Sequence, residues 1–93
     1  MKTIIRGEKR YISIRLSQKA GRFGISGATY EIRLEDRETI FDTGECGVED
    51  NTVWMLFDST QHEVGDTLYV YFWVKITDTQ KLVNGIVRVE IAR

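Results

Sequence analysis

Residues 67–77 read Thr-Leu-Tyr-Val-Tyr-Phe-Trp-Val-Lys-Ile-Thr, and this stretch decides the fold. Alternate residues of a β-strand lie on the same face. One face would then be the apolar row Leu68, Val70, Phe72, Val74 and Ile76. The other would be the aromatic row Tyr69, Tyr71 and Trp73. A helix of this sequence would have no polar face, and β-branched and aromatic residues favour strands. We therefore predict the central strand of a small β-sandwich, with Phe72 in the core.

Further strands are predicted on both sides of this segment. Their ranges are 2–6, 9–16, 28–35, 39–43, 52–57 and 82–91. Most alternate between apolar and polar residues, which is typical of half-buried antiparallel strands. The residues expected to face the core are Ile12, Ile14, Leu16, Ala28, Tyr30, Ile32, Leu34, Val53, Met55, Phe57, Val83, Val87, Val89 and Ile91. The short strand over 39–43 has acidic flanks that suit a sheet edge.

Loops and turns are predicted between the strands. We expect loops over 17–27, with Phe23 and Ile25 tucked under it, and over 44–51, and turns over 36–38 and 78–81. Residues 58–66 contain the only plausible helical turn, where Thr60 and Glu63 have capping-box spacing and Gly65 ends the turn. Seven strands, several at spacings of roughly 8–12 residues, are typical of an immunoglobulin-like sandwich. The prediction is one all-β domain over residues 1–93, an immunoglobulin-like β-sandwich of about seven antiparallel strands.

Charge is divided unevenly along the chain. Residues 1–22 contain seven Lys or Arg and one Glu, whereas residues 31–66 contain eleven acidic residues and two Arg. The basic residues alternate with core residues and the net charge is −1, which argues against a nucleic-acid partner. Two interpretations remain: strands of opposite charge lie near each other on the surface, or the charges serve contacts between subunits.

Targeting signals and disulfides are not expected. The first ten residues have only Ile4 and Ile5 as an apolar pair, too few for a signal-peptide core, and no apolar run is long enough for a membrane helix. The single cysteine, Cys46, rules out an internal disulfide. We expect a protein that is made in the cytoplasm and has no membrane partner.

The residues also offer little catalytic chemistry. The only histidine is His62, and Cys46 lies in an acidic segment whose carboxylates are expected to raise the pKa of its thiol. One Cys and one His are too few for a structural zinc site. The acidic residues Asp42, Glu45, Glu49 and Asp50 lack EF-hand spacing. We predict a protein that is not an enzyme, with no catalytic residue, metal or cofactor.

Three segments carry a resemblance to a known family. They are Arg-Gly-Glu-Lys-Arg-Tyr-Ile-Ser-Ile at 6–14, Ile-Ser-Gly-Ala-Thr-Tyr-Glu-Ile at 25–32, and Gly-Asp-Thr-Leu-Tyr-Val-Tyr at 65–71 followed by Asp78 and by Gly-Ile-Val-Arg-Val at 85–89. Together they resemble the immunoglobulin-like domains of bacteriophage tail and baseplate proteins, most closely the amino-terminal domain of baseplate upper proteins. The resemblance implies a structural protein of a tail, neck or baseplate. It also implies location in the bacterial cytoplasm when made and in the virion when assembled.

The aromatic row is the candidate interface. If the apolar row faces the core, Tyr69, Tyr71 and Trp73 face outward, and their neighbours should be Ile86 and Arg88 on one side and Glu31 and Arg33 on the other. Tyrosine, tryptophan and arginine together match the composition of interface hot spots. Such an apolar patch is unusual on a monomer, so something should cover it. The cover is either part of the same chain or another subunit, which would be a second copy or another phage structural protein.

A different class of function remains open. In a small carbohydrate-binding module, aromatic side chains form a platform on which sugar rings stack. The residues for such a platform would be Trp54, Tyr69, Tyr71 and Trp73.

Overall fold

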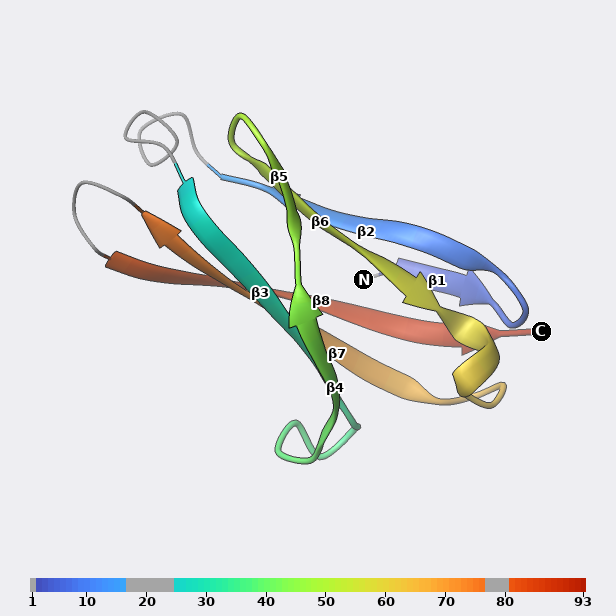
Figure 1. The fold of residues 1–93 in the computed structure, drawn as a ribbon. Coiled ribbons are helices and arrows are strands. Elements are labelled where there is room, and N and C mark those ends of the chain that lie inside the picture. Colours follow the sequence, from blue (N-terminus) through green and yellow to red (C-terminus); the bar gives the residue numbers. More distant parts are fainter. Residues whose placement is uncertain (1, 17–24, 77–80) are drawn as a thin grey trace.

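The protein is an all-β sandwich of two sheets (Figure 1). The computed structural model describes residues 2–16, 25–76 and 81–93, and no α-helix occurs among them. The strands are β1 (Lys2–Ile5), β2 (Lys9–Arg15), β3 (Ile25–Arg33), β4 (Ile40–Glu45), β5 (Gly47–Glu49), β6 (Thr52–Asp58), β7 (Thr67–Ile76) and β8 (Lys81–Ala92). One sheet has the order β1-β8-β7-β3-β4 and the other β2-β6-β5.

The strand β7 is the middle strand of the five-stranded sheet, as predicted. It is antiparallel to β3 on one side and to β8 on the other. Its apolar row is buried throughout: Leu68, Val70, Phe72, Val74 and Ile76. The side chains that β6 contributes to the same core are Val53, Met55 and Phe57. Because these two rows come from different sheets, their contact holds the sandwich together.

The strand number and direction differ from the prediction. The described residues form eight strands rather than seven, and β1 runs parallel to β8, so the five-stranded sheet is mixed. The added strand is β5, which lies in a segment predicted to be a loop and pairs with β6. The sequence does not reveal β5, because the segment consists mainly of polar and glycine residues, and its outward side is exposed and carries few apolar residues. The parallel pairing joins the two ends of the chain, which no local pattern reveals.

Consecutive strands cross between the sheets at both edges of the sandwich. At one edge β1 lies in the five-stranded sheet and β2 in the three-stranded sheet. At the other edge β4 leads directly into β5, as Figure 1 shows, and the backbone N–H of Cys46 between them donates to the carbonyl of Ala28 at 3.0 Å. The two layers are therefore linked covalently along both edges.

Several predicted boundaries need correction. The strand β3 begins at Ile25, so residues 25–27 are not loop, and it ends at Arg33, which leaves Leu34 exposed instead of facing the core. The helical turn is a short 3-10 helix, η1 (Ser59–Gln61). Its cap is Asp58, whose carboxylate accepts from the backbone N–H of Thr60 at 3.0 Å, rather than Thr60 itself.

Some predictions fall outside the described residues. These are most of the loop over 17–27, including Phe23, the turn over 78–80, and the inward orientation of the Val83 side chain.

Removing the Phe72 side chain tests the assignment of the two faces of β7. Phe72 is fully buried, so Phe72→Ala is expected to lower the free energy of unfolding by about 3–5 kcal/mol. A domain of this length has roughly 5–14 kcal/mol in total. Ile86→Ala, on the exposed side of β8, is the matched control and should cost far less. Chemical denaturation gives both values, and a loss below about 1 kcal/mol for Phe72→Ala would mean that the faces are reversed.

Candidate binding surfaces

The aromatic row of β7 has the neighbours that the sequence predicted. Tyr71 lies opposite Glu31 of β3 and Ile86 of β8. Tyr69, the next residue of β7 on the same face, lies opposite Arg33 of β3 and Arg88 of β8. We call this outer side of the five-stranded sheet, centred on Tyr69, Tyr71 and Trp73, the aromatic face.

Two arginines cover much of the aromatic face. The guanidinium of Arg33 lies 4.1 Å from the ring centre of Tyr71. Arg37, in the turn after β3, lies 4.8 Å from the ring centre of Tyr69 and donates from Nε to the hydroxyl of Tyr71 at 3.0 Å. Only 7% of Tyr71 is exposed as a result. The chain itself therefore provides part of the cover, which was one of the two alternatives left open by the sequence.

Glu31 fixes the other end of the aromatic face. One of its carboxylate oxygens accepts from Nε1 of Trp73 at 2.9 Å and from Arg33 at 2.8 Å. These hydrogen bonds, first that from Arg33 and then that from Trp73, lower the pKa of Glu31. A carboxylate that holds both an indole and a guanidinium restricts the rotamers of each. The side chains of Trp73 and Arg33 are consequently held in place on the aromatic face.

The turn that supplies Arg37 is itself held by local hydrogen bonds. Asp36 accepts from the backbone N–H groups of Glu38 and Thr39, each at 2.9 Å, and from the hydroxyl of Thr39 at 2.6 Å. Contacts to Thr39 and then Glu38 lower the pKa of Asp36. Arg37 has a φ of 63°, in the left-handed region. This backbone conformation turns the chain so that Arg37 lies over the tyrosines.

Aliphatic side chains remain exposed at the border of the aromatic face. Ile86 of β8 is 42% exposed, and Ile40 of β4, opposite Arg33, is also exposed. Arg88 is exposed and forms an ion pair with Glu90 at 3.0 Å. The accessible surface is therefore a partly buried aromatic and arginine centre with apolar residues at its sides.

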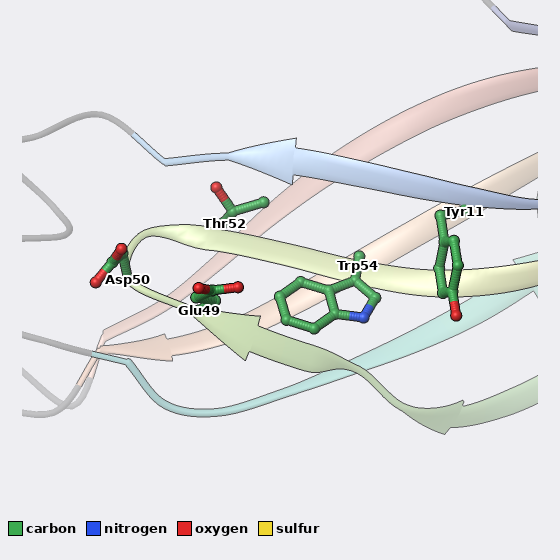
Figure 2. Close-up of a pocket in the computed structure, with 5 residues that line it drawn as sticks. All are labelled: Tyr11, Glu49, Asp50, Thr52 and Trp54. Carbon is green, nitrogen blue, oxygen red and sulfur yellow. The ribbon is translucent and has the colours of Figure 1, made fainter.

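A separate groove lies on the outer side of the three-stranded sheet (Figure 2). Its volume is about 420 Å³, and it is lined by Tyr11, Glu49, Asp50, Thr52 and Trp54. Trp54 thus belongs to a different sheet from the aromatic row of β7 and faces the opposite side of the sandwich. The four-residue sugar platform of Trp54, Tyr69, Tyr71 and Trp73 is therefore not formed. Sequence reasoning missed the groove, because Tyr11 and Glu49 meet Trp54 only through strand pairing.

Opposite charges gather at opposite edges of the sandwich. Lys9, Arg10 and Arg15 are exposed on β2, at one edge of the three-stranded sheet. Asp42, Glu45 and Glu49 are exposed on β4 and β5, which follow each other along the other edge. None of the ion pairs among the described residues joins the two edges. Opposite charges nevertheless lie near each other within the three-stranded sheet: Lys9 of β2 is paired with Asp58 of β6, and Arg15 and Glu49 lie on either side of Thr52. The interpretation that strands of opposite charge lie near each other on the surface is therefore confirmed for these residues.

His62 is a buried polar residue that packs beside the core. It is buried, its ring centre lies 4.7 Å from that of Phe41 and 5.4 Å from that of Phe57, and its carbonyl accepts from Nε of Arg6 at 2.6 Å. Burial lowers the pKa of its imidazole, although Asp66 and Asp58 act in the opposite direction. The neutral ring packs between the two phenylalanines.

Cys46 lies where the chain crosses from β4 to β5. Its side chain is half-buried and packs against the core. Burial raises the pKa of its thiol to about 11. The direction agrees with the sequence prediction, but the cause is desolvation and not the neighbouring carboxylates. At neutral pH the group is a protonated thiol, which is a poor nucleophile.

Within residues 2–16, 25–76 and 81–93, His, Cys, Asp and Glu side chains do not gather in threes around a possible metal position. None of the helical structure described there has the length and apolarity to cross a bilayer. Comparisons of the chain with protein-family models, curated proteins and solved structures find no match.

The buried imidazole should make stability depend on pH. The pKa of His62 is lower in the folded than in the unfolded chain, so the unfolded chain binds more protons as the pH falls. The free energy of unfolding should therefore decrease between about pH 7.5 and pH 5.5, before the carboxylates titrate. His62 is the only histidine, so His62→Gln should be less stable at pH 7.5 and show a flat profile over the same range. An equal slope in both proteins would contradict the assignment.

The raised thiol pKa should slow the reaction of Cys46 with alkylating reagents. With a pKa of about 11, the native protein should react with iodoacetamide at mildly alkaline pH about a hundredfold more slowly than the denatured chain. Mass spectrometry of timed samples measures both rates. Similar rates would show that the thiol is solvated in the folded protein.

Proposed function

We propose that this chain is an immunoglobulin-like domain of phage or prophage origin that works as a non-enzymatic assembly protein, through protein–protein contacts in a tail, neck or baseplate. Strand order supports the fold. Immunoglobulin sandwiches pack a sheet containing strands G, F and C against one containing B, E and D. If β2 is strand B, the following strands β3 to β8 are C, C′, D, E, F and G in chain order. The order β8-β7-β3-β4 is then G-F-C-C′, and the order β2-β6-β5 is B-E-D. With only one cysteine, the chain lacks the disulfide of antibody domains.

The observation that carries the contact function is the aromatic face. Protein interfaces concentrate their binding energy in tyrosine, tryptophan and arginine, and rigid side chains lose little entropy on binding. Here Tyr71 is fixed by two arginines and Trp73 by Glu31 before any partner arrives. Exposed Ile86 and Ile40 add apolar area that a partner can bury. The phage setting rests on the resemblance of the segments at 6–14, 25–32 and 65–71.

The charged edges supply an orientation for contacts between copies. Two basic edges repel each other, and so do two acidic edges, whereas the basic edge of one copy attracts the acidic edge of the next. Unpaired edge strands are also ready to add a further strand. A contact between two different edges is heterologous, and such contacts close into rings when the rotation allows. This geometry suits the circular layers of a tail.

Multi-angle light scattering tests the self-association form of the proposal. If the partner is a second copy, wild type should have a mass above that of the 10.8 kDa chain, and Ile86→Glu should reduce it. The variant introduces a charge at a 42% exposed position. Leu56→Glu is the matched control, because Leu56 is 48% exposed on the other sheet, and it should leave the mass unchanged.

The remaining outcomes decide between partners. A multimer that survives Ile86→Glu and Trp73→Glu would place the contact on another face. If the wild type is a monomer, the partner must be another phage protein. Sequencing the genes that flank this one then tests whether such a partner is encoded nearby. A monomer whose flanking genes include no tail, neck or capsid gene would contradict the proposal.

A further inference from the structure

We propose that the groove on the outer side of the three-stranded sheet binds a flat, equatorially linked oligosaccharide, with one sugar ring stacked on the indole of Trp54. The groove and the aromatic face lie on opposite sides of the sandwich, so this inference does not depend on the proposed assembly role. Figure 2 shows the five side chains concerned, which come from β2, from β6, and from β5 and its turn.

The indole of Trp54 lies flat against the sheet. A Cβ built on Gly47 of β5 would come within 2.2 Å of Cε2 and 2.5 Å of Nε1 of Trp54. The ring therefore rests on the backbone of Gly47, the residue of β5 with which Trp54 is paired. Gly47 lies against one face of the indole, and Figure 2 shows the ring in full view over β5, so that its other face is open to the groove. A wide, flat aromatic surface at the bottom of a shallow groove is complementary to the apolar C–H face of a pyranose ring.

Polar groups stand beside the indole at one end of the groove. The carboxylates of Glu49 and Asp50 accept hydrogen bonds, and the hydroxyl of Thr52 both donates and accepts. Asp50 is held by its turn, where it has a φ of 55°. Asn51 ties this turn to the end of β2: the N–H of Leu16 donates to its carbonyl at 2.8 Å, and its Nδ2 donates to the carbonyl of Leu16 at 3.0 Å. The backbone that carries the two carboxylates is thus held in place before a ligand binds.

Tyr11 extends the site along the sheet. It is 65% exposed and lies opposite Leu56, two residues beyond Trp54 on the same side of β6. Such diagonal neighbours on one side of a sheet are about 7–8 Å apart, so a single ligand can touch both aromatic rings. A chain of sugar rings would meet Trp54 and Tyr11 in succession, whereas one sugar would meet only one of them.

A guanidinium next to the groove offsets part of the negative charge of its two carboxylates. Arg15 of β2 lies opposite Thr52, which in turn lies opposite Glu49, so one row on this side contains a guanidinium, a hydroxyl and a carboxylate. A quaternary ammonium or lysine ligand would be repelled by Arg15 as well as attracted by the carboxylates. Sugar hydroxyls hydrogen-bond to all three groups, because each hydroxyl both donates and accepts.

Fluorescence of Trp54 gives a direct test. The chain has two tryptophans, so in a Trp73→Phe background Trp54 is the only one. Cellohexaose and the N-acetylglucosamine hexamer are the probes, because their β-1,4-linked rings present flat C–H faces. We expect a saturable blue shift of the emission at millimolar or lower concentrations, and calorimetry should show that Trp73→Phe binds as the wild type does.

Variants then assign the contacts. Trp54→Ala is expected to weaken binding by about tenfold or more, in a protein shown by circular dichroism to be folded. Removing the indole can also loosen β5, so Glu49→Gln and Asp50→Asn provide a second test of the site. Both variants keep the side-chain shape, and asparagine tolerates the left-handed φ of position 50. Each should weaken binding several-fold, because a charged hydrogen-bond acceptor is replaced by a neutral one. Glu45→Gln, an exposed carboxylate on β4, is the matched control and should have no effect.

Three results would overturn the proposal. The first is the absence of any spectral or calorimetric response to both hexasaccharides. The second is binding that Trp54→Ala, Glu49→Gln and Asp50→Asn leave unchanged, which would place the sugar elsewhere. The third is a response of Trp54 to choline or to a trimethyl-lysine peptide in preference to both sugars, which would make the groove a cation site.

Discussion

The burial of one side of β7 against β6 is the constraint on which the remaining structure depends. The apolar row of β7 and Val53, Met55 and Phe57 of β6 belong to different sheets, and their contact excludes water from the space between the layers. At roughly 25 cal/mol per Å² of apolar surface, a few such side chains outweigh any surface interaction in a domain of this size. Because residues alternate strictly between faces, burying this row forces the aromatic row of the same strand outward.

An outward aromatic row on a central strand must be shielded or used. Here it is partly shielded: Arg33, Arg37 and Glu31 fix Tyr71 and Trp73, while Ile86 and Ile40 remain exposed. Each arginine contact with a ring at the surface stabilises the fold only modestly. Its larger effect is to order the side chains, so that a partner would meet a preformed surface. The same contacts that lower the apolar exposure of the chain therefore also order the side chains of the aromatic face.

Glycine determines where aromatic rings lie against the sheets at the β4–β5 edge. Trp54 rests on Gly47, and Tyr30 rests on Gly44, where an added Cβ would come within 2.7 Å of the ring. These two glycines stand on either side of Cys46, where the chain passes from one sheet to the other. A glycine covered by a neighbouring aromatic ring loses less packing than a bare one, so a segment rich in glycine and acidic residues still forms strands. This explains why a stretch with the composition of a loop is regular structure.

The sequence alone determined most of the strands and which side of most of them is buried, because alternation is a local property of five to ten residues; it missed β5 and placed Leu34 in the core. It correctly assigned the two sides of β7, the buried residues of β6, the edge position of β4 and the residues opposite Tyr69 and Tyr71. Tertiary structure decided what no local pattern contains: β1 beside β8, Arg37 over rings more than thirty residues away, and Tyr11 and Glu49 beside Trp54. Those contacts depend on how strands distant in the chain pair and pack, and it is this pairing that creates the candidate binding surfaces.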